Sequence, residues 1–154
     1  MAKHVVLVIS LILQVFQTQG QFRDSVVYSN YFEWDQGYGL HQEKGDFELT
    51  VELQGDSLLW SADARFPSNK SLVLSSDRNH IAAFSNDVEM VFYHKREQQL
   101  FYLIKWENTY TAYGVGKGEL AIEEALERII LLLNKGTGLE GVAEFLERQA
   151  VYDF

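Results

Sequence analysis

Aromatic side chains are concentrated in a short segment near the N-terminus, where acidic residues and a histidine lie between them. Tyr28, Tyr31, Trp34 and Tyr38 are the members that we expect to bind a ligand. Aromatic rings beside carboxylates can stack on sugar rings or line the pocket of a small molecule. The alternative is that Tyr28, Phe32 and Trp34 belong to the core of an aromatic-rich sheet.

Two carboxylates of the same segment could act as a general acid and a general base. Glu33 and Asp35 are two residues apart, so on a strand both side chains would point the same way. Glycoside hydrolysis needs such a pair roughly 5 to 10 Å apart, with pKa values separated by their surroundings. Because the chain has 22 acidic residues, pairs of this spacing arise readily by chance. A small carboxylate-dependent hydrolase is therefore kept as the second alternative function.

No motif for metal, phosphate or thiol chemistry is complete. His41, His80 and His94 lack the spacing of metal ligands on one element, and the absence of cysteine excludes disulfides, thiolate metal sites and thiol nucleophiles. The glycine-rich residues 114–118 resemble a phosphate-binding nest in outline only, since the P-loop spacing is absent and Glu119 brings negative charge to the following helix. We expect no metal, no cofactor and no catalytic residue.

The chain is acidic. Thirteen Lys and Arg against 22 Asp and Glu give a formal charge of −9, which works against binding nucleic acid. Seven glutamates lie on the two predicted C-terminal helices: Glu119, Glu123, Glu124, Glu127, Glu140, Glu144 and Glu147. They form either a solvated face or a docking surface for a basic protein. The second interpretation supports the first alternative function, an intracellular acidic inhibitor, immunity-type protein or chaperone that binds a basic partner.

The N-terminus has the pattern of a secretory signal. A short basic start is followed by the apolar run of residues 5–16 and by a polar stretch in which Thr18 and Gly20 suit a cleavage site. The run is too short for a stable membrane anchor, because a transmembrane helix needs about 20 apolar residues. We therefore expect a signal peptide over residues 1–20, a single domain over residues 21–154 and a secreted protein. The one glycosylation sequon begins at Asn69, in a predicted surface turn, so we expect glycosylation at Asn69.

Hydrophobic periodicity predicts the α+β class. Between residues 46 and 115, short alternating or apolar stretches are separated by turn signals, which is typical of an antiparallel β-meander. Residues 79–85 and 88–93 form the clearest hairpin, and residues 100–106 are apolar on both faces, as in a central strand. Before this region we expect a first strand near residues 25–32 and a loop after it. We expect about six or seven strands in all.

Two amphipathic helices follow the meander. From Ile122 to Leu133 the apolar spacing changes to 3.6 residues, and Gly136 suits a left-handed cap at the end of this helix. A second apolar stripe begins at Leu139. Strands first and helices last predict that both helices pack on one face of the sheet.

These patterns favour a secreted, cysteine-free protein that binds an extracellular ligand or protein and performs no catalysis. Binding would use the aromatic segment or a face of the sheet. A homodimer built on an exposed strand edge stays open, because an apolar strand such as residues 100–106 is covered either by a helix or by another chain.

Overall fold

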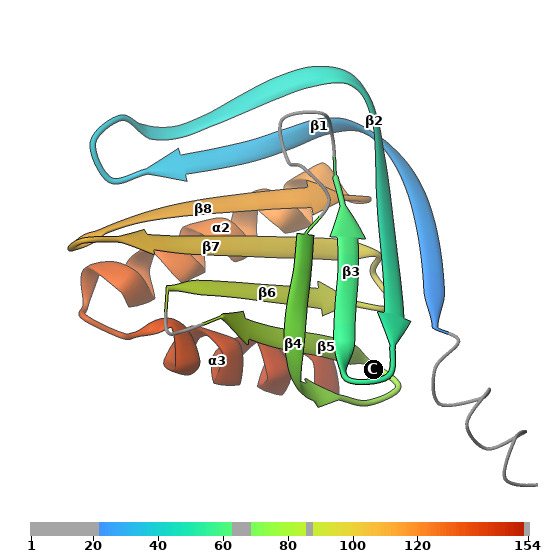
Figure 1. Cartoon of the computed structure of the whole chain (residues 1–154). Coiled ribbons are helices and arrows are strands. Elements are labelled where there is room, and N and C mark those ends of the chain that lie inside the picture. Colours follow the sequence, from blue (N-terminus) through green and yellow to red (C-terminus); the bar gives the residue numbers. More distant parts are fainter. Residues whose placement is uncertain (1–21, 63–68, 86–87, 153–154) are drawn as a thin grey trace, which may run out of the picture.

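The computed structural model describes residues 22–62, 69–85 and 88–152, which form one antiparallel sheet followed by two helices (Figure 1). Each strand pairs with the next in sequence, and β8 pairs with β1, so the curled sheet closes on itself. The elements are β1 (Arg23–Asp35), β2 (Gly39–Gln54), β3 (Ser57–Ser61), β4 (Asn69–Ser76), β5 (His80–Ser85), β6 (Glu89–His94), β7 (Gln99–Trp106), β8 (Thr109–Gly116), α2 (Glu119–Asn134) and α3 (Leu139–Tyr152).

The predicted α+β class is confirmed, with an antiparallel meander and two helices packed on it. The sheet has eight strands rather than six or seven. The strands are also longer at the N-terminus, where the residues after 32, predicted as a loop, extend β1 to Asp35 and start β2 at Gly39. The predicted hairpin is β5 and β6, with Ser85 opposite Glu89. The predicted central strand is β7, which lies between β6 and β8.

The inner face of the curled sheet holds the first of two hydrophobic cores. Strand alternation sends every second side chain to this face. Its largest fully buried members are Tyr31, Leu49, Leu58, Ile81, Tyr93 and Leu100. Removing such side chains from water stabilises the fold by about 1.5–3 kcal/mol each.

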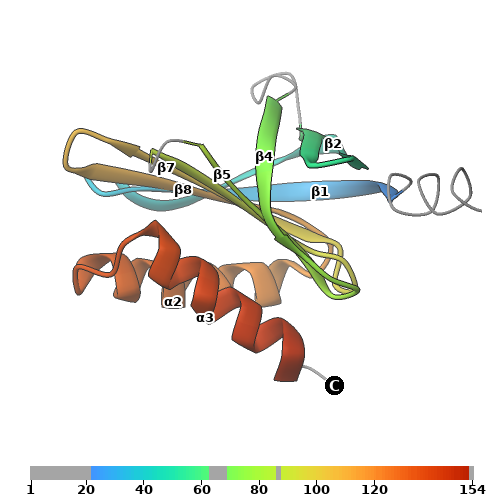
Figure 2. The same cartoon turned by 60° about the horizontal axis from the view of Figure 1, so that its bottom comes forward.

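The outer face of β5 to β8 and of the second half of β1 holds the other core, beneath the helices. Figure 2 shows both helices on this one face of the sheet. The stripe Ile122, Leu126, Ile129 and Leu133 of α2 is buried there, as its spacing predicts. Strands buried on both faces read as continuous apolar runs, which explains the sequence of β7.

Glycine begins and ends α2 in the left-handed region. Gly118 precedes the helix with φ 80°, and Gly136 follows it with φ 87°. The N–H of Gly136 donates to the Leu133 carbonyl and that of Thr137 to the Leu132 carbonyl, so the last turn is closed by backbone bonds. The predicted left-handed cap at Gly136 is confirmed. No helix in residues 22–62, 69–85 and 88–152 is both long and apolar enough to span a membrane.

Two predictions about processing stay predictions. The signal peptide over residues 1–20 lies outside the described residues. Glycosylation of Asn69 stays a prediction. Asn69, predicted in a turn, is the first residue of β4, where it pairs with Trp60; the preceding residues 63–68 lie outside the described residues.

Candidate functional site

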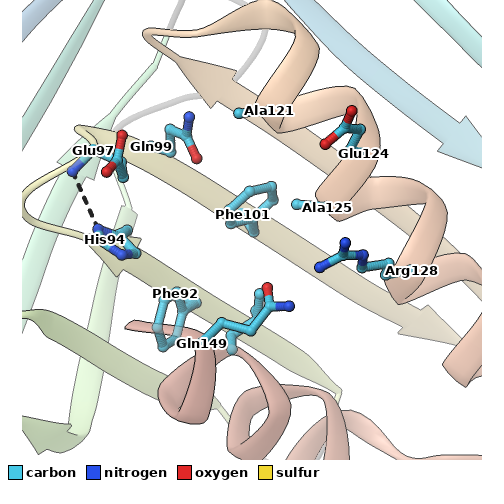
Figure 3. Close-up of a pocket in the computed structure, with 11 residues that line it drawn as sticks. Phe92, His94, Glu97, Gln99, Phe101, Ala121, Glu124, Ala125, Arg128 and Gln149 are labelled. Atoms are coloured by element: carbon cyan, nitrogen blue, oxygen red, sulfur yellow. Dashed lines mark hydrogen bonds between the residues drawn. The ribbon is translucent and has the colours of Figure 1, made fainter. Parts of the chain in front are cut away.

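A cleft of about 610 Å³ opens between α2, α3 and the outer face of β6 and β7 (Figure 3). The two helices are close at their connecting loop and diverge from it (Figure 1). The cleft lies toward the β6–β7 turn, away from that loop. Its lining residues are Phe92, His94, Glu97, Gln99, Phe101, Ala121, Glu124, Ala125, Arg128, Leu146 and Gln149.

The floor of the cleft is aromatic. Phe92 on β6 and Phe101 on β7 are register partners and therefore share one face of the sheet. Ala121 and Ala125, one turn apart on α2, face this floor (Figure 3). Their short side chains leave open the space that a larger residue would fill. A rigid apolar floor of this kind is a common feature of small-molecule sites.

The polar rim comes from all three walls. The β6–β7 side supplies His94 and Gln99, α2 supplies Glu124 and Arg128, and α3 supplies Gln149. The rim therefore carries both signs of charge. Such a mixture can orient a ligand that has a donor at one position and an anionic group at another.

The β6–β7 side of the rim is held in place by hydrogen bonds. The backbone N–H of Glu97 donates to His94 Nδ1 at 3.1 Å, so the neutral imidazole carries its proton on Nε2. The Gln99 amide donates from Nε2 to the Lys117 carbonyl at 2.8 Å. Both His94 and Gln99 are buried. Because they are fixed before a ligand arrives, this wall loses little conformational entropy on binding.

A histidine cluster lies next to the floor. His80 pairs with His94 across β5 and β6, and its ring stacks on Phe92 with centroids 5.3 Å apart. His80 Nε2 is 3.2 Å from Ser75 Oγ and 3.5 Å from Glu147 Oε1 of α3. Sequence reasoning noted His80 and His94 only for lacking metal-ligand spacing; the hairpin register was the signal that could have paired them.

The cluster resembles a hydrolytic triad in distance but not in connectivity. Asp77 Oδ1 is 3.1 Å from His80 Nδ1, without the geometry of a hydrogen bond. The Ser75 hydroxyl donates to Glu147 at 2.7 Å, so its proton is not donated to His80 as a triad requires. The arrangement connects α3 to the β4–β5 hairpin.

A second set of polar groups lies on the inner face of the sheet. The hydroxyl of Tyr31 donates to Glu43 at 2.7 Å, and that of Tyr102 to Glu89 at 2.8 Å. Burial, with a smaller contribution from Glu33, raises the pKa of Tyr113 to about 12. Each of these phenols is a hydrogen-bond donor at neutral pH, as its carboxylate partner requires.

The four aromatic residues predicted to bind a ligand do not lie on one surface. Tyr28 and Tyr31 are buried on the inner face, whereas Trp34 is buried on the outer face under the helices. Tyr38 is in the β1–β2 turn and is 91% exposed. The structure brings Tyr28 and Tyr31 together around Phe47, with ring centroids 5.3 and 5.2 Å from its own. Ligand binding by the four residues stays a prediction.

The carboxylates of the hydrolase alternative lie on adjacent inward-facing positions of β1. Glu33 is 3.3 Å from His41 Nε2, and Asp35 accepts the backbone N–H of Gly37 at 2.7 Å. Asp35 is thus engaged in the β1–β2 turn. At the glycine-rich loop, the Asn30 amide donates to Glu119, so a protein carboxylate occupies this helix start. No three His, Asp or Glu side chains in residues 22–62, 69–85 and 88–152 are placed to hold a metal ion.

Comparison with models of protein families, with curated proteins and with solved structures finds no match to this chain. Function is therefore argued from geometry alone. Phe92, Phe101, Arg128 and Gln149 were missed as site residues, because their common location depends on strand register and on how the helices cross the sheet. The class that fold and site define is an α+β protein with a cleft beneath two diverging helices.

Proposed function

We propose that this protein is a secreted binding protein without catalytic activity, and that its ligand occupies the cleft between α2, α3 and the sheet. The observation that carries the proposal is an aromatic floor of paired Phe92 and Phe101 beneath a rim of both charges. Small-molecule sites are few per protein and combine an apolar lining with a few placed polar groups, which supports this cleft as the binding site. Binding through a face of the sheet agrees with the sequence-based expectation.

The chemistry of the cleft selects a small ligand with an aromatic body and an anionic group. The body would pack against the apolar lining of the cleft, which combines small exposed parts of the two phenylalanines with Ala125 and Leu146. The anionic group would lie at Arg128, whose guanidinium suits a carboxylate or sulfonate. Glu97 and Glu124 would accept hydrogen bonds from donors elsewhere on the ligand.

The dye 8-anilinonaphthalene-1-sulfonate is a suitable probe, because it combines aromatic rings with one anionic group. We expect saturable binding by fluorescence, with about tenfold weaker affinity in Arg128→Gln and in Ala121→Trp, which fills the cleft. Leu131→Trp is the matched control on the same helix, since Leu131 is 58% exposed and does not line the cleft.

The two cleft variants test the location of binding, provided that circular dichroism shows them folded. Unchanged dye affinity in both would refute the cleft as the site. An equal loss in Leu131→Trp would show that the dye reports a general effect on α2 instead.

A further inference from the structure

The first half of β1 has an edge without a strand partner. β1 pairs with β2 along its length but with β8 only over residues 31–35. Among the described residues, no strand pairs with residues 23–30 on the side of β8. This open edge lies at the corner where β8 ends and α2 begins.

Hydrogen-bond alternation shows which backbone groups face the open edge. The Leu53 N–H donates to the Phe22 carbonyl at 2.9 Å, so Phe22 faces β2. The register is regular from there to Tyr28. The backbone N–H and C=O groups of successive residues in an antiparallel strand point to opposite neighbours. Those of three residues therefore point to the open edge: Arg23, Ser25 and Val27.

One of these donors already has a side-chain partner. The N–H of Ser25 donates to the carboxylate of Asp24 at 3.0 Å, which partly protects the edge. Asp24 also accepts hydrogen bonds from Gln98 and Tyr93, so its position is fixed. Natural edge strands often carry such devices against unwanted pairing. A partner strand would compete with Asp24 for the Ser25 N–H, whereas the N–H groups of Arg23 and Val27 have no partner among the described residues.

The surface beside the edge is both apolar and acidic. Val27 is 73% exposed and lines a cavity of about 280 Å³ between residues 27–30 and 116–119. On β2, Glu48 is opposite Val27 and Glu52 is opposite Arg23. Asp46 and Glu119 line the same cavity together with one basic residue, Lys117, and Arg23 is exposed on the edge itself, so acidic groups outnumber basic ones here.

We propose that this edge binds an extended segment of a partner protein in which basic residues alternate with apolar or β-branched ones. The added strand would complete the backbone hydrogen bonds of β1, as in other cases of strand addition. Val27, Glu48 and Glu52 point to the same face of the sheet, so the basic side chains of the added strand would lie on that face and its apolar ones on the face of Val26 and Tyr28. Adjacent strands are about 4.8 Å apart, so Glu48 and Glu52 would lie about 10 Å from the added strand, within reach of an extended lysine or arginine.

Charge selects this occupant over a second copy of the chain. Self-pairing would join two molecules of formal charge −9 and bring their acidic β2 strands toward each other. The edge and the α2–α3 cleft share no lining residue, so this inference does not depend on the ligand proposed for the cleft.

The test uses a fluorescent heptapeptide that alternates lysine and valine, with fluorescence anisotropy as the readout. We expect binding that weakens with salt, because the contacts with Glu48 and Glu52 are exposed. Val27→Pro, which removes one N–H from the open edge but none from the β2 ladder, should weaken binding at least about tenfold. Val27→Thr keeps that donor and should change affinity by about twofold or less.

A change on the peptide keeps the test independent of protein folding. Methylating the alternate peptide nitrogens that face β1 should abolish binding, whereas methylating the other set should not. Equal binding of both methylated peptides, or of a peptide with glutamate in place of lysine, would overturn the proposal. Absence of binding at about 1 mM peptide would also overturn it. A dimer that Val27→Pro converts to monomer would instead assign the edge to self-association.

Discussion

The contact between α2 and the sheet can be tested at Gly114, where an added methyl group has no room. A Cβ at this position of β8 would lie 2.6 Å from Ile122 Cγ2 and 2.9 Å from Leu126 Cδ1. Both contacts are side chains of α2, and Gly114 is not among the glycines with positive φ. The cost of Gly114→Ala therefore comes from overpacking, for which about 1–3 kcal/mol of unfolding free energy is expected.

Removing the Leu126 side chain creates the complementary defect. Leu126 is fully buried on the side of α2 that faces the sheet, so Leu126→Ala should lower the free energy of unfolding by about 2–5 kcal/mol. In the double variant, the methyl group added at Gly114 enters part of the space that Leu126 vacates. We expect the double loss to be smaller than the sum of the single losses by about 1 kcal/mol, within the range known for residues in contact. Relief is incomplete because the close approach to Ile122 remains.

The assay is urea unfolding followed by tryptophan fluorescence, with the midpoint and slope fitted for each variant. Leu131→Ala, on the exposed side of the same helix, is the control; it should change stability by less than about 0.5 kcal/mol and add independently to Gly114→Ala. Strict additivity of Gly114→Ala and Leu126→Ala would refute the reasoning, since it would mean that α2 does not rest on β8 at this point.

Three further predictions concern other parts of the fold. Gly116→Ala should cost more than about 3 kcal/mol in urea unfolding or prevent folding, because φ is 127° and a Cβ would lie 2.1 Å from the Gln98 carbonyl oxygen. The pKa of Tyr113 is raised from 10.0 to about 12, so the contribution of this phenol to stability is complete below pH 10 and is lost as the pH rises toward 12. A pH titration of phenolate absorbance should show a group that ionises near pH 12 and is absent from Tyr113→Phe. Glu147→Gln should destabilise α3 by about 1–2 kcal/mol, measured as faster amide hydrogen exchange in that helix, whereas exposed Glu144→Gln should not.

The elements that sequence predicted well are those with a single repeating pattern. The 3.6-residue spacing of α2 and the alternation in the second half of β2 report directly which side is buried. β1 and the first half of β2 gave no such pattern. β1 is buried on one face before Tyr28 and on both faces near Tyr31, and the register with β2 shifts between Tyr28 and Asn30. A strand that changes its buried face in this way has no constant period. Residues 39–46 of β2 looked like a loop for another reason: none of them is buried, so they lack an apolar alternation.

The candidate site was less predictable because it depends on contacts between distant elements. Phe92 and Phe101 read as ordinary core residues of two strands, and Arg128 reads as part of the polar side of a helix. Only the divergence of α2 and α3 opens a cleft over these two rings, which are themselves 1% and 2% exposed, and places Arg128 on its rim. The one local signal of a cleft was the pair of small residues Ala121 and Ala125 on the side of α2 that lines it. This signal is not specific, because alanines are also common where helices pack closely.

The position of α3 links the cleft to the histidine cluster. Leu146 and Gln149 line the cleft, and Glu147 lies between them in sequence while its side chain accepts the Ser75 hydroxyl. Any conformation in which α3 leaves the sheet therefore loses both this hydrogen bond and one wall of the cleft. If the binding-competent fraction of the protein falls, the apparent dissociation constant rises by the same factor. Weakening the hydrogen bond between Ser75 and Glu147 should thus reduce affinity for a cleft ligand without altering any residue that lines the cleft. Conversely, a ligand at about 100 times its dissociation constant should stabilise the form in which α3 packs on the sheet by about 2.7 kcal/mol.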